Sequence, residues 1–381
     1  MFLTTYLKQR IVERNYSILI AICCLGVSFF LFPVGSFSQN KDSTSSFKLS
    51  GYTDVYYAHY SDSVGINNYS KFAAISPRND AFGLNVLQLT AQYSSSKLRA
   101  TATMHYGDLP ASAWSPQFNL IQEANIGFRL NKKMWIDAGL FKTHIGTESL
   151  LPKDNIASSL SIITVYEPWW QSGVKLSYAP NDKLFLCFHI LNGYNTFVTI
   201  NKTKSVGIAA TYTFSDKASL GYYSLYGDET PDTINGTHLR LLNNLVFTYI
   251  LTPKLKSVIG VDYISQENSG INDPNKTAYV YSAIVTLRYQ LKPKLGVYGR
   301  FEAFSDANGM LTGIMLDAEN NLTGYKLTDY TLGLEYKPTG NSYVRLESRS
   351  IVMDADQKIF HTDGSNTNVR WEMMINAGIW F

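Results

Sequence analysis

The stretch 369–381, VRWEMMINAGIWF, alternates between two kinds of side chain at every step. One side carries Val369, Trp371, Met373, Ile375, Ala377, Ile379 and Phe381, and the other carries Arg370, Glu372, Met374, Asn376, Gly378 and Trp380. A period of two indicates a β-strand, because successive side chains of a strand point to opposite faces. The first face suits hydrocarbon and the second suits a wet interior, with aromatic residues near the ends. This profile is typical of a strand in a transmembrane barrel.

The segment 277–291 repeats the pattern in the middle of the chain. Its predicted outer face carries Tyr279, Tyr281, Ala283, Val285, Leu287 and Tyr289, whereas Val280 and Ile284 are apolar exceptions on an otherwise polar inner face. Similar segments recur along the chain, at 47–60, 82–93, 97–106, 119–130, 134–141, 172–178, 183–192, 205–214, 217–226, 239–250, 254–265, 294–305, 327–336 and 341–351. The segment 239–250 alternates poorly, and a β-bulge there would explain this.

The connections between these segments alternate between short and long. The short ones are 94–96, 131–133, 179–182, 215–216, 251–253, 292–293 and 337–340, and the long ones begin near residues 61, 107, 142, 193, 227, 266, 306 and 352. Short periplasmic turns and long extracellular loops characterise outer-membrane barrels. We therefore predict an all-β, transmembrane, antiparallel up-and-down barrel of about 16 strands over residues 47–381.

The first 38 residues have the profile of a secretory signal peptide. Lys8, Arg10 and Arg14 precede an apolar stretch at 18–32, and small residues at Ser36 and Ser38 favour cleavage after Ser38. A membrane anchor is the alternative, but about 15 apolar residues fall short of the roughly 20 that span a bilayer. Residues 39–46 would form a short polar leader.

The mature chain has a near-neutral charge and one cysteine. Removal of the signal takes away three of the 33 basic residues and one of the 30 acidic ones, which leaves 30 against 29. This balance gives no reason to expect nucleic acid as a partner. Cys187 alone cannot form an internal disulfide or a multi-thiolate metal site, and we expect no cofactor.

A barrel of this size encloses a lumen that side chains cannot fill, so water is its default content. The inner positions of the late strands are charged, and the predicted pore-lining residues are Arg300, Glu302, Asp329, Glu335, Arg345, Glu347, Arg349, Arg370 and Glu372. These mixed charges would either orient polar solutes in a transverse field or pair with one another to stiffen the wall.

The longest connection, 142–171, is apolar in its middle. It would either fold inward and narrow the pore, with Glu148, Asp154 and Glu167 as constriction carboxylates, or pack over the rim or against a neighbouring barrel. Trp169 and Trp170 fit an interface between copies as well as they fit a constriction, so a homo-oligomer is compatible with the sequence.

Two stretches on either side of this connection carry a family resemblance. They are DAGLFKTHIGTES, with Gly139, Phe141, Gly146 and Glu148, and YEPWWQSGVKLSY, with Glu167, Pro168 and Gly173. They resemble the OmpL-like family of outer-membrane porins over essentially the whole mature chain. The resemblance implies a porin-like barrel and passive transport, and it implies no catalytic or solute-binding residues.

Two other classes of function compete with a porin for small polar solutes. An enzyme would need a nucleophile, a base and an orienting group in contact, and the six histidines, at 59, 105, 144, 189, 238 and 361, lie singly and without metal-binding spacing. A rim-located hydrolase assembled from distant strands stays an alternative. A structural or adhesive barrel that acts through its Gly-, Asn- and Thr-rich loops is the other.

The terminal Phe381 has two expected roles. It would seat the last strand in the lipid interface, and by analogy with other outer-membrane proteins it would be recognised by the barrel-assembly machinery.

Overall fold

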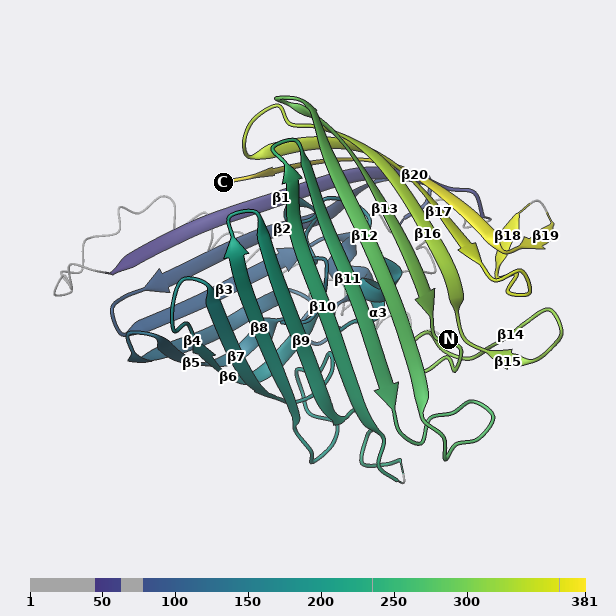
Figure 1. Cartoon of the computed structure of the whole chain (residues 1–381), viewed down its shortest axis with the longest axis horizontal. Coiled ribbons are helices and arrows are strands. Elements are labelled where there is room, and N and C mark those ends of the chain that lie inside the picture. Colours follow the sequence, from purple (N-terminus) through teal and green to yellow (C-terminus); the bar gives the residue numbers. More distant parts are fainter. Residues whose placement is uncertain (1–44, 63–77, 235, 363) are drawn as a thin grey trace, which may run out of the picture. The chain divides into compact units, whose positions relative to one another are not determined.

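The computed structural model describes residues 45–62, 78–234, 236–362 and 364–381, and these form a closed antiparallel barrel of sixteen strands (Figure 1). In barrel order the strands are β1 (Ser46–Tyr60), β2 (Ala81–Ser94), β3 (Leu98–Tyr106), β4 (Ile121–Asn131), β5 (Met134–Lys142), β6 (Trp170–Tyr178), β7 (Leu184–Leu191), β8 (Ser205–Ser215), β9 (Ala218–Asp228), β10 (Leu239–Thr252), β11 (Leu255–Gln266), β12 (Ala278–Lys292), β13 (Leu295–Ser305), β16 (Lys326–Tyr336), β17 (Ser342–Met353) and β20 (Val369–Trp380). Each strand pairs with its neighbours along the chain, and β20 returns to β1.

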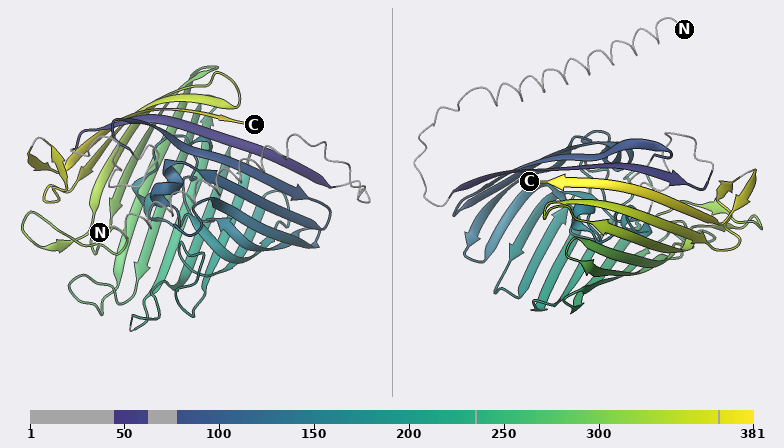
Figure 2. Two further views of the ribbon diagram at one scale, coloured as in Figure 1. Left: turned by 180° about the vertical axis from the view of Figure 1, so that it is seen from behind. Right: turned by 90° about the horizontal axis from the view of Figure 1, so that it is seen from above.

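The barrel closes where the first and last strands pair. Tyr52 lies opposite Trp380 and Tyr60 opposite Glu372 in the register of β1 and β20, and Figure 2 shows the purple and yellow ribbons side by side. Phe381 extends this seam, because its backbone N–H donates to Gly51 O at 3.1 Å and its carbonyl accepts from Gly51 N at 3.2 Å. The ring of Phe381 covers Gly51 so closely that a Cβ there would lie 2.6 Å from it.

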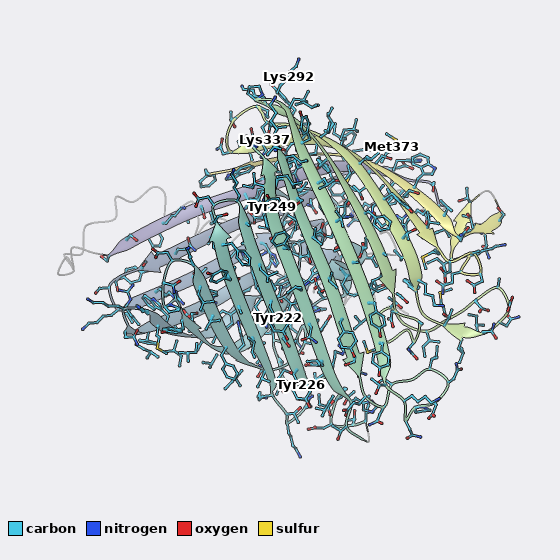
Figure 3. All side chains as sticks on the ribbon, in the orientation of Figure 1. Tyr222, Tyr226, Tyr249, Lys292, Lys337 and Met373 are labelled. Atoms are coloured by element: carbon cyan, nitrogen blue, oxygen red, sulfur yellow. The ribbon has the colours of Figure 1, made fainter. Side chains whose placement is uncertain are left out.

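The outer face is apolar along its whole height, as the alternation predicts. Trp371, Met373 and Ile375 are all more than 40% exposed, whereas Arg370 and Glu372 between them are buried. Figure 3 shows Lys292 and Lys337 near the short-turn end and Tyr226 toward the long-loop end of the wall. In a bilayer the exposed apolar side chains contact lipid, and the closed ladder satisfies the backbone groups that hydrocarbon cannot.

The strand bounds agree with the sequence prediction to within two residues, but the bulge expected within 239–250 is absent. The pairing of β10 with β9 runs without a shift from Leu239 to Tyr249. Against β11, β10 shifts register only at its end, between Ile250 and Thr252. Shifts inside other strands occur at Asp54/Val55 on β1 and at Thr103/Met104 on β3. The alternation of β10 is poor because its inner face carries Leu242, which is buried in an apolar cluster inside the barrel.

The long connections carry further short elements. These are α2 (Asp108–Ala113), the 3₁₀ turn η1 (Pro152–Asp154), α3 (Ile162–Tyr166), and two hairpins, β14 (Met315–Leu316) with β15 (Leu322–Thr323) and β18 (Phe360–Thr362) with β19 (Ser365–Thr367). Among the described residues no helix is long and apolar enough to cross a membrane. The predicted signal peptide 1–38 and residues 39–44 of the predicted leader lie outside the described residues.

Candidate functional site

The connection between β5 and β6, residues 143–169, is called the inner loop because it lies inside the barrel. Figures 1 and 2 show α3, which belongs to it, within the ring of strands. Its residues Ile162 and Ile163 are fully buried against side chains that point inward from the wall. The inner loop thus reaches the interior instead of packing over the rim.

The nine charged residues predicted to line the pore all point into the barrel, and all are only 0–3% exposed. Much of their charge is paired across neighbouring strands: Arg345 donates to Glu335 from Nε at 2.9 Å and from Nη2 at 2.8 Å, and Arg349 donates to Asp329. Farther along, Arg370 Nε lies 3.4 Å from Glu372. These side chains form a buried ladder on the inner wall of β13, β16, β17 and β20, and they do not face open water.

Two of these carboxylates bind the backbone of the inner loop. Glu347 accepts the backbone N–H groups of residues 158 and 159 at 2.7 and 2.9 Å. Glu302 accepts those of residues 162 and 163 at 2.7 and 2.9 Å. Each carboxylate therefore satisfies two consecutive donors that no strand or helix partner could reach. We call Glu302 and Glu347 the carboxylate clamp.

Two arginines bind the loop carbonyls in the same way. Arg300 donates to Ser159 O at 2.6 Å, and Arg345 donates to Pro152 O at 2.9 Å and to Asn155 O at 3.0 Å. The wall charges thus act as hydrogen-bond partners for an irregular backbone. This is how a segment without regular structure can be buried inside a barrel.

The three carboxylates predicted at the constriction occupy different places. Glu148 forms an ion pair with Arg300 at 2.9 Å, and Glu167 is buried at 1% exposure. Asp154 keeps 42% of its side chain exposed and pairs with its neighbour Lys153 at 2.8 Å. The structure brings the first two against the wall and leaves the third in solvent.

Apolar contacts hold the inner loop as well, and they explain the two exceptions in 277–291. Val280 and Ile284 are fully buried on the inner face of β12. They belong to a cluster with the loop that also contains Ile145, Ile162, Ile163, Leu191, Leu225, Leu242, Ile264, Phe304, Leu327, Ile351, Met353 and Phe360. An apolar residue on the polar face of a barrel strand therefore marks the place where the loop docks.

A second apolar cluster joins the inner loop to its neighbouring long loops. Trp169 and Trp170 pack with Trp114, from the loop after β3, and with Phe197, from the loop after β7. The ring centroids of Trp114 and Trp170 are 4.6 Å apart. In this chain the two tryptophans are thus engaged within one barrel.

Several accessible charges inside the barrel are ones that the sequence prediction did not single out. They lie on inward positions near the short turns, and they are Lys48, Arg99, Arg129, Lys175, Lys256 and Arg288. The inward carboxylates of the same region, Asp54, Asp137 and Glu335, are 0, 2 and 1% exposed. All six basic positions lie on the polar face of an alternating strand, but only the structure shows that their acidic neighbours are covered.

A comparison with protein-family models decides the identity of the chain. Residues 46–381 match the family described as "Putative beta-barrel porin-2, OmpL-like". The chain belongs to this family. It is therefore an outer-membrane porin, a channel through which solutes diffuse, and its family is one of channels and not of enzymes. Among curated proteins, none matches the sequence.

Solved porin structures share the fold of this porin at low sequence identity. The anion-selective porin of Comamonas acidovorans aligns with a TM-score of 0.60 and 10% identity over 88% of this chain and 100% of its own. The DcaP channel of Acinetobacter baumannii aligns with a TM-score of 0.59 and 12% identity over 90% of this chain and 99% of its own. OmpT of Vibrio cholerae aligns with a TM-score of 0.55 and 12% identity over 90% of this chain and 99% of its own. These likenesses establish the fold alone.

Histidines of the porin contact a carboxylate, an aromatic ring or each other. His59 bonds Asp80 at 2.7 Å, and its ring also packs against that of Trp371, with centroids 5.3 Å apart. The rings of His144 and His189 stack on each other inside the barrel, with their centroids 4.0 Å apart. Over the described ranges there is no group of three or more His, Cys, Asp or Glu side chains that could hold a metal ion.

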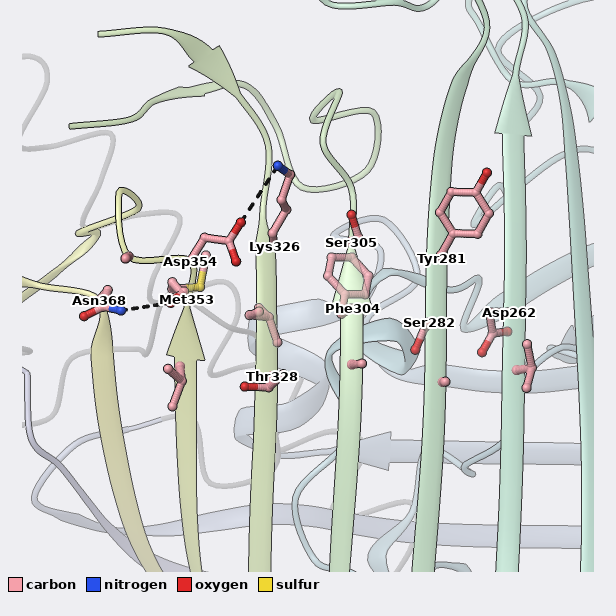
Figure 4. Close-up of a pocket in the computed structure, with 16 residues that line it drawn as sticks. Asp262, Tyr281, Ser282, Phe304, Ser305, Lys326, Thr328, Met353, Asp354 and Asn368 are labelled. Atoms are coloured by element: carbon pink, nitrogen blue, oxygen red, sulfur yellow. Dashed lines mark hydrogen bonds and ion pairs between the residues drawn. The ribbon is translucent and has the colours of Figure 1, made fainter. Parts of the chain in front are cut away.

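A groove of about 800 Å³ runs along the surface of the wall at the long-loop ends of β12, β13, β16 and β17 (Figure 4). Small outward residues, Ala283 and Ala303, form part of its floor. Lys326 and Asp354, 3.8 Å apart, stand at one edge. These outward residues place the groove on the outer face of the barrel.

Proposed function

We propose that this porin passes small polar solutes through a water-filled interior and that it prefers anions. The observation that carries the proposal is the asymmetry of accessible charge near the short turns. Six basic side chains there are half-buried or exposed, while the carboxylates of the same inner surface are at most 2% exposed. A solute responds to accessible charge in a narrow, low-dielectric passage, so a basic inner surface concentrates anions and repels cations.

The inner loop supplies the constriction in this proposal. Its contacts with β13 and β17 hold it across part of the interior on the long-loop side of the basic residues. Glu148 and Glu167 act there as anchors of the loop, and Asp154 is the one member of the predicted set whose side chain faces solvent. The buried ladder stiffens the wall against which the loop rests.

Neutralising accessible basic residues should reduce the anion preference. Lys48, Arg129 and Lys256 are exposed on inward positions, so the triple variant K48Q/R129Q/K256Q removes inner charge without stripping a buried carboxylate of its partner. In a KCl gradient the dilute side should be negative for the wild-type pore, and this zero-current potential should move toward zero in the variant. The measurement should use dilute salt, because the screening length is only about 10 Å at 0.1 M.

Turn lysines provide the matched control. K132Q/K133Q/K217Q changes the net charge equally, at exposed residues in short turns outside the strands' inner faces, and its potential should stay close to that of the wild type. A triple variant that behaves like this control would show that the inner basic residues do not set the selectivity.

We also propose that the chain is exported with cleavage after Ser38, and that Phe381 assists recognition by the barrel-assembly machinery and anchors β20 in outer-membrane lipid. Intact mass of the mature protein should place Gln39 first. OmpT of Vibrio cholerae has been solved in a trimer form, and by similarity we propose a homo-oligomer, which light scattering in detergent would measure.

Deletion of Phe381 should impair assembly more than conduction. The variant loses the two backbone bonds that Phe381 shares with Gly51 at the seam and an aromatic residue that is 74% exposed on the lipid side. We expect several-fold less heat-modifiable barrel in the outer membrane, with wild-type single-channel steps from the fraction that folds. F381W should assemble normally, and equal assembly of the deletion variant would refute the role.

A further inference from the structure

Three buried side chains meet where the inner loop joins the wall. Glu167, which follows α3, is 1% exposed, Asp262 on β11 is 1% exposed, and Asn244 on β10 is fully buried. Asn244 and Asp262 are opposite each other in the strand register, and Asn244 Nδ2 donates to Asp262 Oδ1 at 2.7 Å. The carboxyl groups of Glu167 and Asp262 lie within hydrogen-bonding reach of each other.

Four oxygen atoms of this cluster have no hydrogen-bond donor among the described residues. They are both Oε atoms of Glu167, Oδ2 of Asp262 and Oδ1 of Asn244. Neither carboxylate has a basic side chain within ion-pair distance in the described part of the chain, unlike Glu148, which pairs with Arg300. Buried carboxylates without a donor or a positive charge are costly, so an arrangement of this kind points to a positively charged ligand or a retained proton.

Other acidic side chains lie close to Glu167. The carboxylates of Asp262, Glu148 and Glu302 all interact electrostatically with Glu167. Arg240, which is on β10 with Asn244, lies over the ring of Tyr194, with 4.9 Å between its Cζ and the ring centroid. Glu167 and Asp262 thus adjoin further acidic groups, and neither forms an ion pair with a basic side chain among the described residues.

There is room for a ligand beside the cluster. A cavity of about 360 Å³ is lined by Gly146, Thr147, Glu148, Glu167 and Tyr223, among others. Gly146 has a φ of 120°, and a Cβ there would stand 3.0 Å from Glu167 Oε2. Thr147 Oγ1 lies 3.2 Å from Asn244 Nδ2 and adds a further oxygen at the edge. Glycine therefore keeps the approach to the carboxylate open.

We propose that Glu167, Asp262 and Asn244 form a site for a hard divalent cation, with Ca²⁺ as the best match. Calcium binds six to eight oxygen ligands, including carboxylates, amide carbonyls and water. Two carboxylates balance its charge, Asn244 Oδ1 supplies a neutral oxygen, and water in the adjoining cavity completes the shell.

The bound cation would fasten the inner loop to β10 and β11. The carboxylate clamp holds the same loop on β13 and β17, so the cation is a second and independent attachment. This inference rests on the packing of the loop and not on the proposed anion preference.

The test uses the whole mature barrel, refolded in detergent free of lipopolysaccharide and freed of metals with EDTA. Titration calorimetry with CaCl₂ should give one site per chain. E167Q and D262N should each weaken binding at least about tenfold, because even groups that only orient metal ligands commonly cost that much when removed. D154N and E319Q, which change exposed acids, should bind as the wild type does.

A stability readout separates the cation from a shared proton. Calcium should raise the temperature of heat modification of the wild type and not that of E167Q or D262N. A wild type that binds no Ca²⁺ or Mg²⁺ at millimolar concentration, while E167Q folds with equal or greater stability, would overturn the proposal in favour of a proton shared by the two carboxyl groups. Binding that persists unchanged in both variants would also overturn it, because the site would lie elsewhere.

Discussion

E302Q/E347Q should increase the single-channel conductance several-fold and admit larger sugars. The carboxylate clamp accepts four loop N–H groups at 2.7–2.9 Å, and glutamine replaces one accepting oxygen of each carboxylate with an NH₂ group that cannot accept. Hydrogen bonds to a charged group contribute about 1.5–3 kcal/mol each, so the two that are lost amount to roughly 3–6 kcal/mol, and the two that remain weaken because they now go to a neutral amide. A shift of about 5.5 kcal/mol moves a two-state equilibrium from 1:99 to 99:1. The loop should therefore leave the interior.

Swelling of proteoliposomes in sugars of increasing size measures the opening, together with conductance in planar bilayers. E319Q removes an exposed carboxylate from a long loop and should leave both unchanged. An E302Q/E347Q barrel that folds and yet keeps the wild-type size limit would show that the clamp does not hold the loop in place.

Arg300 should be the most sensitive single position for stability. Its side chain is fully buried, and it pairs with Glu148 at 2.9 Å, lies 3.8 Å from Asp329 and donates to the loop carbonyl of Ser159 at 2.6 Å. Removing one partner of a buried ion pair leaves an uncompensated charge and costs about 3–5 kcal/mol. R300M should lose about this much unfolding free energy in urea titrations of the barrel in lipid vesicles.

Arg288 offers a matched comparison. It also binds a carboxylate, Glu335, at 2.7 Å, but 21% of its side chain is exposed and Glu335 keeps Arg345 as a second partner. R288M should therefore cost about 1 kcal/mol or less. Equal losses in the two variants would mean that the buried network around Arg300 does not stabilise the barrel.

The barrel and its strand bounds were predictable because one physical constraint acts on every strand. Lipid outside and polar groups inside impose a period of two, as in 369–381, and the biogenesis of the barrel sorts short turns from long loops. For the inner loop the sequence left two positions open: inside the barrel, or over the rim or against a neighbouring barrel. The apolar residues of 142–171 require burial, but sequence alone does not say whether they are covered by this barrel or by another.

The sequence does not show which of the inner charged side chains are buried and which are exposed. Arg345 and Arg129 both occupy inward positions, yet Arg345 is 2% exposed against Glu335 and the inner loop, while Arg129 stays exposed beside the ring of Trp135. The difference depends on where the loop docks, which is a long-range contact. The local signal that could have located it is Val280 and Ile284, apolar residues on the polar face of their strand.

A salt-gradient recording of wild-type channels in planar bilayers shows whether this porin is an open, anion-preferring passage. Barrels shown to be folded by heat-modifiable gel mobility should give discrete, ohmic current steps in KCl, with the dilute side negative at zero current. Folded barrels that conduct no current at any voltage would show that the passage is closed, and a zero-current potential of the opposite sign would show that it prefers cations.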